Sequence, residues 1–299
     1  MKDSKEILAV GSIAYDSIET PMGNRERILG GSCTYFSIAA SYYTQTSIIG
    51  VVGNDFDKDS WDLFKKYNIN TECVEVADGK TFSWGGKYNH DYSERETLFT
   101  DLGVFESFSP KIKRDIENPI LYLGNIQPDL QLDVINKVES KYLIAADSMN
   151  LWIDLCPDKV WELISKVNLF MLNDEEARQL TNKDNLEEIA NDFLKLGPTI
   201  IIIKMGGEGS LIAYNNKKIY VSVVPGIEVY DPTGAGDSFA GGVLGYIANN
   251  GMKDPVKAVI NGTAVASYTV SGFGLENLCK LNKDDLNQKI NQISLKSSI

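Results

Sequence analysis

Residues 231–242, DPTGAGDSFAGG, decide the fold class and the chemistry that the rest of the chain has to support. The small residues Gly234, Ala235 and Gly236 come just before an apolar segment, 238–249, that is predicted to be a helix. Unobstructed backbone N–H groups at the beginning of a helix bind anions, because they and the positive end of the helix dipole point at the same place. This turn is therefore predicted to hold a phosphate-sized anion.

Asp237 stands beside the predicted anion site. A carboxylate there repels an anion, unless its task is to take a proton from a nucleophile that attacks phosphorus. The alternative is that Asp237 is an ordinary acid of the first helical turn and Asp231 a cap. The glycines alone do not decide between these interpretations, because short glycine patterns occur widely.

Short apolar runs alternate with helical segments along the chain, which is typical of a parallel sheet with helices on both faces. Strands are predicted at 7–12, 47–52, 120–124, 142–146, 169–172 and 199–204, with a hairpin joining 209–214 to 218–223. Helices are predicted at 34–43, 57–67, 130–140, 159–165, 174–180, 185–196, 238–249 and 255–268. We expect one doubly wound α/β domain, residues 1–299, with ligands at the carboxyl ends of its strands.

Two polar, alternating segments, 17–30 and 80–105, do not fit this pattern. They are predicted to form a separate small β-sheet, either as surface hairpins without a role or as a lid over the site.

Composition and missing motifs exclude several classes of function. A net charge of −12 argues against a nucleic-acid or anionic membrane surface, and the apolar run 7–10 is too short for a signal peptide or a membrane span. The single histidine, His90, leaves little support for His-based catalysis. A Walker A motif is missing, because Val74 stands where its first glycine belongs, and Gly11 is not followed by the Rossmann pattern. The four cysteines are far apart and indicate neither zinc nor disulfides, so a reducing cytoplasm is expected; they are Cys33, Cys73, Cys156 and Cys279.

The string D-x-T-G-A-G-D-x-F followed by A-G-G closely resembles the C-terminal signature of the ribokinase-like, or PfkB, family of carbohydrate and nucleoside kinases. One departure is Pro232, where the family usually has Thr or Ser. The resemblance implies a ribokinase-like fold, ATP as the phosphoryl donor, Mg²⁺, and in many members K⁺. It also implies that the small sheet closes over the sugar and often mediates homodimers.

For the acceptor, the resemblance implies that Asp16 bonds two sugar hydroxyls and that Gly30 and Gly31 let the sugar approach the backbone. A carboxylate suits a vicinal diol because it accepts with both oxygens. The family usually has Asn four residues after the second glycine, where this chain has Tyr35, which indicates an altered acceptor pocket. Asn125, with Asp147 and Asn150, is expected to line the same site.

For the donor and metal, Asn173 and Glu176 have the spacing of the family's N-x-x-E motif, which organises Mg²⁺ and its waters. The same spacing is a helix capping box, and the two roles can coexist. Asp237 would be the base, assisted by the amides of residues 234–236, and Asp231 is expected to shape the K⁺ site. The remaining nucleotide contacts implied by the resemblance are Lys204, Gly207, Gly209, Thr233 and Asn261.

We therefore expect a cytoplasmic, ATP-dependent phosphotransferase that acts on a primary hydroxyl of a sugar. A nucleoside kinase is the alternative acceptor class, in which aromatic side chains stack on a base. Those side chains are Tyr35, Phe36, Trp84 and Tyr88. A non-catalytic relative that binds nucleotide or sugar is the alternative from another class.

Overall fold

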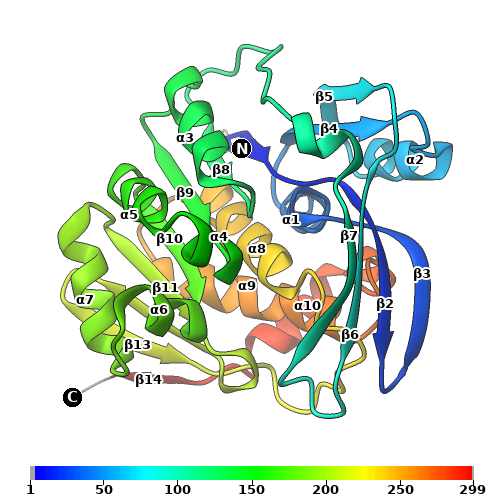
Figure 1. Cartoon of the computed structure of the whole chain (residues 1–299). Coiled ribbons are helices and arrows are strands. Elements are labelled where there is room, and N and C mark those ends of the chain that lie inside the picture. Colours follow the sequence, from blue (N-terminus) through cyan, green and yellow to red (C-terminus); the bar gives the residue numbers. More distant parts are fainter. Residues whose placement is uncertain (1–3, 298–299) are drawn as a thin grey trace.

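The computed structural model describes residues 4–297, and its centre is a ten-stranded sheet (Figure 1). The strand order is β14-β13-β12-β11-β10-β9-β8-β1-β4-β5. From β11 to β5 the neighbouring strands are parallel, and β12 to β14 add an antiparallel edge. The parallel strands are β1 (Ile7–Val10), β4 (Thr46–Gly53), β5 (Ile69–Ala77), β8 (Ile120–Leu123), β9 (Leu143–Asp147), β10 (Leu169–Asn173) and β11 (Ile200–Lys204). The antiparallel strands are β12 (Ser210–Tyr214), β13 (Lys217–Val221) and β14 (Leu295–Ser297).

The predicted fold class is confirmed, and each predicted strand forms with its ends within two residues of the expected positions. The edge strands β5 and β14 were not predicted. β5 reads INTECVEVA and pairs only with β4, so it mixes exposed polar residues with buried ones and lacks a continuous apolar run.

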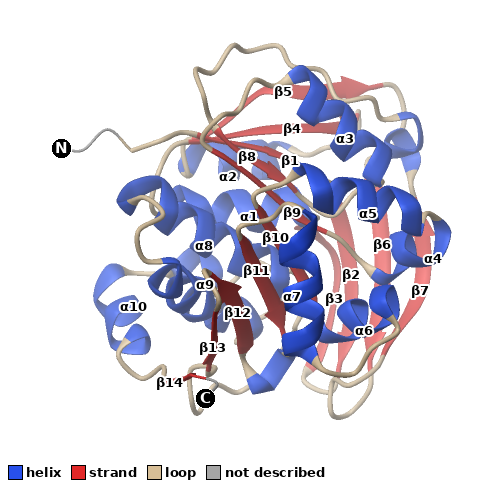
Figure 2. Ribbon diagram, turned by 90° about the vertical axis from the view of Figure 1, so that its left-hand side faces the viewer, coloured by secondary structure: helices blue, strands red, loops and turns tan. Residues whose placement is uncertain are grey.

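Helices cover both faces of the sheet (Figure 2). One face packs against α1 (Ser32–Ser41), α2 (Lys58–Lys66), α8 (Ala235–Asn250), α9 (Pro255–Val270) and α10 (Lys283–Ile290). The other packs against α3 (Pro128–Lys137), α4 (Asn150–Leu155), α5 (Pro157–Lys166), α6 (Asp174–Thr181) and α7 (Leu186–Leu196). All predicted helices are present. α8 begins three residues earlier than predicted, which places Gly236 and Asp237 in its first turn.

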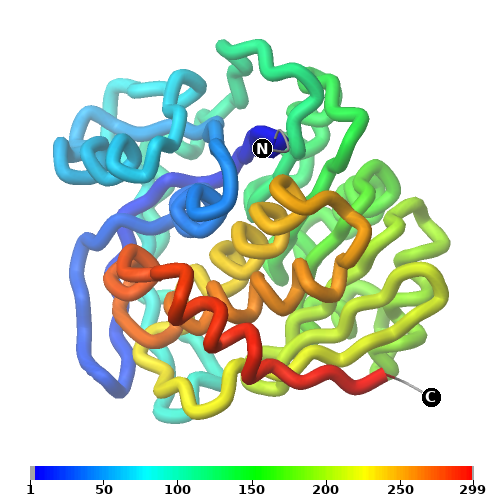
Figure 3. Tube along the Cα trace, turned by 180° about the vertical axis from the view of Figure 1, so that it is seen from behind, coloured from blue at the N-terminus to red at the C-terminus, as the bar shows by residue number. Residues whose placement is uncertain are grey.

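The second half of the 231–242 motif serves helix packing. Helices α1, α8 and α9 lie side by side in Figure 3, and α8 touches both neighbours through glycines. A Cβ on Gly241 would lie 2.5 Å from the carbonyl oxygen of Phe36, and one on Gly242 would lie 2.9 Å from Gly262 Cα. These glycines therefore allow backbone contact between helices, which holds the first turn of α8 against the core.

A separate four-stranded sheet, here called the small sheet, has the order β3-β2-β6-β7. Its strands are β2 (Ala14–Thr20), β3 (Gly23–Gly30), β6 (Phe82–Tyr88) and β7 (Arg95–Asp101), and they confirm the sheet predicted at 17–30 and 80–105. The edge strand β7 is exposed at every residue. Among residues 4–297, no helix has the length and apolar character needed to cross a membrane.

Candidate active site

Three neighbouring strands end in polar residues at the same edge of the central sheet. Asp147 ends β9, Asn173 ends β10 and Lys204 ends β11. Asn173 is directly opposite Lys204 in the parallel register. The carboxyl edge of the sheet, where ligands bind in such folds, thus carries one cation and several hydrogen-bonding groups.

The first turn of α8 lies against this edge. Gly234, at its N-cap, has φ 74°, and a Cβ there would lie 2.3 Å from the ring of Tyr35. Glycine is therefore required at position 234 both by backbone conformation and by space. A Cβ on Gly236 would lie 3.2 Å from Lys204 Nζ, so the ammonium group sits beside the helix N-terminus. The helix amides and Lys204 together form a positively polarised site for an anion.

The amide of Ala235 differs from expectation, because it already donates to the carbonyl oxygen of Pro232 at 3.1 Å. This hydrogen bond closes the tight turn that places Gly234 in the left-handed region. The amides of Gly234 and Gly236 remain as the predicted anion donors.

Lys204 is held by a buried ion pair. Its Nζ donates to Asp147 Oδ2 at 2.6 Å, with 18% and 5% of the two side chains exposed. Burial by itself would lower the lysine pKa, but the carboxylates of Asp147 and Glu176 outweigh it and raise that pKa. Lys204 is therefore positively charged at neutral pH.

Asp237 has the acid–base character of a catalytic carboxylate. Its pKa is raised to about 7, chiefly by burial and then by the carboxylate of Asp147, while the charge of Lys204 opposes the rise. A carboxyl group with a pKa near the operating pH is suited to accept a proton and later release it.

Asn173 and Glu176 form the predicted capping box. The backbone N–H of Asn173 donates to Glu176 Oε2 at 2.8 Å, and the N–H of Glu176 donates to Asn173 Oδ1 at 2.7 Å. Burial raises the pKa of Glu176 to about 7, the carboxylate of Asp147 adds to this, and Lys204 opposes it. The second oxygen of Glu176 is not engaged by the capping box, so capping and support of a cation are compatible here.

Asp16, on β2 of the small sheet, lies beside Gly30, which ends β3, and near Gly31, the N-cap of α1. It is 4% exposed, and a Cβ on Gly30 would lie 1.9 Å from its Oδ2. Gly31 has φ 91°, and a Cβ there would lie 2.5 Å from the carbonyl oxygen of Ser12. Burial first, and then the charge of Asp231, raise the pKa of Asp16 to about 7. The two glycines thus leave room for a buried carboxyl group near the anion-binding turn of residues 234–236, here called the nest.

Tyr35 lies beneath the nest. It is 1% exposed, its ring contacts Gly234, and its hydroxyl has no hydrogen-bond partner among residues 4–297. Burial and the charges of Asp16 and Asp231 hold its pKa well above the usual value. A buried hydroxyl without a partner is unfavourable in the free protein.

Asp231 is fully buried and uses both carboxylate oxygens. Oδ1 accepts from the N–H of Thr233 at 2.9 Å, and Oδ2 accepts from the N–H of Gly274 at 3.0 Å. It thereby ties the segment before α8 to the loop after α9. Within residues 4–297, no group of three or more His, Cys, Asp or Glu side chains is arranged to hold a metal ion, so Glu176 and Asp231 do not belong to one all-protein cage.

Two of the predicted ligand contacts, Asn125 and Asn261, form hydrogen bonds with other protein groups through their side chains. Asn125 accepts from Trp152 Nε1 at 2.9 Å and donates to Met149 Sδ at 3.1 Å. Asn261 accepts from the hydroxyl of Tyr43 at 3.1 Å and donates to the carbonyl oxygen of Lys257 at 2.8 Å. Asn261 is on α9 next to Gly262, which packs against the middle of α8.

The turn after β11 gives its two glycines different roles. A Cβ on Gly209 would lie 2.1 Å from the carbonyl oxygen of Val221, so this glycine, with φ 98°, is required by the hairpin. Gly207 is exposed, with no atom within 4 Å of a Cβ, and is accessible to a ligand.

One contact at the site could not be expected from the sequence. The hydroxyl of Tyr88, on β6, lies 3.0 Å from Thr233 Oγ1, although 145 residues separate the two. No spacing or motif indicates such a pair, because it depends on where the small sheet lies against the central domain.

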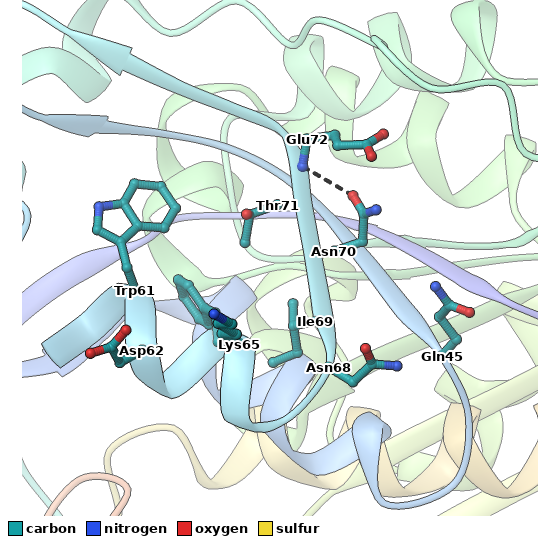
Figure 4. Close-up of a pocket in the computed structure, with 10 residues that line it drawn as sticks. Gln45, Trp61, Asp62, Lys65, Asn68, Ile69, Asn70, Thr71 and Glu72 are labelled. Carbon is teal, nitrogen blue, oxygen red and sulfur yellow. Dashed lines mark hydrogen bonds between the residues drawn. The ribbon is translucent and has the colours of Figure 1, made fainter. Parts of the chain in front are cut away.

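A groove between α2 and β5 lies away from these residues (Figure 4). It is lined by Trp61, Lys65, Asn70, Glu72 and their neighbours, and Asn70 Oδ1 accepts from the N–H of Glu72 at 3.0 Å. None of the predicted site residues lines it, so it is not the candidate active site.

The chain is similar to known proteins along most of its length. The family model described as pfkB family carbohydrate kinase matches residues 5–282. A cytidine kinase from Thermococcus kodakarensis is 22% identical over 267 residues, which cover 84% of this chain and 92% of that protein.

Solved structures show the same fold. A Burkholderia thailandensis nucleoside kinase in complex with inosine superposes with a TM-score of 0.80 at 19% identity, covering 95% of this chain and 97% of that one. A Vibrio cholerae fructokinase double mutant, bound to fructose, ADP and potassium ion, has a TM-score of 0.77 at 17% identity and covers 97% of this chain and 100% of that one. The fold is ribokinase-like, and the chain belongs to the pfkB family of carbohydrate kinases.

Proposed function

We propose that the protein transfers the γ-phosphoryl group of ATP to a primary hydroxyl of a sugar or a nucleoside, with Asp237 as the general base. The observation that carries this proposal is the position of Asp237, in the first turn of α8, with a pKa raised to about 7 by burial and by Asp147. An acid at an anion site has a use when a hydroxyl must lose its proton as it attacks phosphorus.

The chain's own residues divide the work. Asp16 and the Gly30–Gly31 backbone orient the acceptor so that its hydroxyl lies within reach of Asp237, which accepts the proton. The amides of Gly234 and Gly236, with the ammonium of Lys204, stabilise the negative charge on the transferred group. Loss of one such donor typically lowers the rate about 10²- to 10³-fold. Thr233 and the exposed Gly207 are the further proposed contacts to the nucleotide.

The donor set at the carboxyl edge fits a hard cation. Glu176 and Asn173 offer oxygen ligands of the kind that Mg²⁺ prefers, through water, beside an anion site. Glu176 and Asn173 would hold a cation that, when bound, would neutralise charge on the donor phosphates. Asp231, with its links to Thr233 and Gly274, is the proposed support of a monovalent cation, and a homodimer through the small sheet stays a prediction.

A specific observation favours the nucleoside as acceptor. Trp84 is directly opposite Asp16 in the small sheet, so both side chains belong to the same face, and the indole is partly exposed. The guanidinium of Arg95 lies 5.2 Å from the Trp84 ring centroid. Tyr35 and Phe36, by contrast, are 1% and 0% exposed and cannot stack on a base, and the Tyr88 hydroxyl is bonded to Thr233. Trp84 is thus the aromatic group that a base would contact.

The test is Mg²⁺-dependent ATP consumption with a panel of ribose, fructose, 2-keto-3-deoxygluconate, inositol, adenosine and cytidine. We expect product formation with at least one acceptor, and a loss of turnover by 10³-fold or more, on the order of a missing general base, in Asp237→Asn. The variant should melt as the wild type does and still bind ATP. Substantial turnover in Asp237→Asn contradicts the assignment of the base. Nucleotide binding by the wild type without phosphorylation of any acceptor supports the non-catalytic alternative.

A further inference from the structure

Two tyrosines connect the small sheet to the segment that carries the nest. Tyr88 ends β6, and its hydroxyl lies 3.0 Å from Thr233 Oγ1. Tyr92, in the turn between β6 and β7, donates to the carbonyl oxygen of Val229 at 2.9 Å. Their ring centroids are 6.2 Å apart. Both hydroxyls therefore end on residues 229–233, immediately before Gly234.

The backbone at Tyr92, which makes one of these contacts, is strained. Its φ is 62°, in the left-handed region that bulky side chains avoid. Hydrogen bonds across the turn hold it there, since Tyr92 N–H donates to the carbonyl oxygen of Asn89 and Asn89 N–H donates to that of Glu94. Strain of this kind persists only where surrounding interactions determine the conformation, and it is concentrated at functional sites.

The segment contacted by the tyrosines is itself firmly attached to the central domain. The N–H of Tyr230 donates to the carbonyl oxygen of Val270 at 2.7 Å, and Asp231 accepts from the amides of Thr233 and Gly274. A shift of Thr233 is therefore transmitted to Asp231 and to the N-cap Gly234.

The other hairpin of the small sheet, formed by β2 and β3, contacts the loop after α9, which contains Gly274. On β3, Arg25 Nε lies 3.2 Å from Glu276 Oε1, and the Arg25 guanidinium lies 4.4 Å from the Phe273 ring centroid. Arg25 and Glu276 are both largely exposed, so this ion pair is weak. The contact of Tyr88 with Thr233 is more buried than this ion pair, since Tyr88 is 9% exposed.

We propose that Tyr88 and Tyr92 are positioning residues that fasten the small sheet to residues 229–233, so that closure over the acceptor and alignment of the nest amides occur together. This rests on the proposed kinase function. A nest aligned only when the sheet is closed limits transfer of the phosphoryl group to water, because closure also excludes solvent. Loss of either hydroxyl should therefore raise ATP hydrolysis without acceptor relative to phosphorylation of the acceptor.

A double-mutant cycle separates this role from direct contact of Tyr88 with the acceptor. Tyr88→Phe and Thr233→Val are each expected to raise the acceptor KM and the uncoupled hydrolysis about three- to tenfold, the effect of one lost hydrogen bond. The double variant should be no worse than either single variant. If the two effects multiply instead, Tyr88 acts on the acceptor independently of Thr233 and the proposal is wrong.

A measurement without catalysis keeps this inference distinct from the proposed function. Hydrogen exchange of the backbone amides of residues 229–231 and 233–236 should accelerate in Tyr88→Phe and Tyr92→Phe. Tyr42→Phe is the matched control, because its hydroxyl also donates to a carbonyl oxygen, that of Leu278 at 2.9 Å, outside this segment. Accelerated exchange in a protein without kinase activity would leave the fastening intact and refute only the proposed function. Exchange unchanged from wild type in both tyrosine variants would overturn the positioning role.

Discussion

The ammonium of Lys204, on β11, lies 2.6 Å from Oδ2 of Asp147 on β9, although β10 lies between the two strands, and the same ammonium borders Gly236 in the first turn of α8. The two charges of this ion pair have opposite effects on the pKa of Asp237. Asp147 raises that pKa and Lys204 lowers it. Burial is the largest cause of the raised pKa of the proposed base, and the two charges of this buried ion pair adjust that pKa in opposite directions.

The first prediction concerns the dependence of turnover on pH. Turnover of the wild type should fall as the pH drops below about 7, because Asp237, with its pKa raised to about 7, becomes protonated. In Lys204→Met this acid limb should move to higher pH, since the cation that lowers the pKa of Asp237 is gone. In Asp147→Asn it should move to lower pH.

The measurement is turnover at saturating substrates from about pH 5 to pH 9, the range in which such a carboxyl titrates. Lys217→Met, which removes an exposed lysine on β13, is the control and should leave the limb in place. Shifts of the same sign in Lys204→Met and Asp147→Asn would contradict control by the ion pair.

The second prediction concerns stability. Burial and the charge of Asp231 raise the pKa of Asp16 from 3.8 to about 7. The folded protein therefore binds this proton more tightly than the unfolded chain, and the resulting stability is present at low pH and lost as the pH rises through about 7. Asp16→Asn avoids the ionisation, so it should be more stable than the wild type above pH 7 by at most about 4 kcal/mol.

Urea unfolding at about pH 5 and pH 8 tests this, because most of the range in which the stability is lost, from 3.8 to about 7, lies between the two values. The stability gained by Asp16→Asn over the wild type should be larger at the higher pH, together with a raised acceptor KM. Glu117→Gln, an exposed substitution, should show no such change with pH. A gain that is the same at both values would mean that ionisation of Asp16 is not its cause.

The third prediction concerns Tyr35, whose hydroxyl is buried without a partner. Tyr35→Phe keeps the ring that packs against Gly234, so the free energy of unfolding should change by less than about 1 kcal/mol or increase. If the hydroxyl bonds the acceptor, the acceptor KM should rise while the KM for ATP does not.

Tyr122→Phe is the matched control for Tyr35→Phe. Tyr122 is also fully buried, its hydroxyl has no partner within the described residues 4–297, and its ring stacks on Phe36 at 3.9 Å between centroids. Equal acceptor KM values in the two variants would remove Tyr35 from the acceptor site.

Much of the fold could be predicted because its signals are local. Apolar strands such as 200–204 and the capping box of Asn173 and Glu176 are visible within a few residues of sequence, and the structure forms both. The edge strand β5 was not predicted because it contains polar residues. They are tolerated there because β5 lies at the edge of the sheet, with a neighbouring strand on one side, and this position is a property of the sheet rather than of the segment.

The candidate site divides in the same way. The anion turn before α8 follows from glycines adjacent in sequence. The ion pair of Lys204 and Asp147 and the contact of Tyr88 with Thr233 join distant elements, so no local pattern indicates them. Asn261 was predicted as a nucleotide contact from its resemblance to a family position. The hydrogen bond that its side chain accepts from the hydroxyl of Tyr43 is a further long-range contact that no local pattern indicates.

The last prediction concerns Gly30, where the sequence predicts only close approach to a ligand. A Cβ there would lie 1.9 Å from Asp16 Oδ2 and 2.6 Å from Asp16 Cγ, so Gly30→Ala must displace the Asp16 carboxyl group. We expect an acceptor KM raised about tenfold or more, since a charged hydrogen-bonding group is moved, with little change in the KM for ATP. In an Asp16→Ala background the added methyl group has no carboxyl group to displace, and Gly30→Ala should then have almost no further effect on the acceptor KM. Steady-state kinetics of the wild type, both single variants and the double variant measure this coupling. A Gly30→Ala effect of equal size with and without the Asp16 carboxyl group would show that Gly30 acts directly on the acceptor, through the backbone, and not through Asp16.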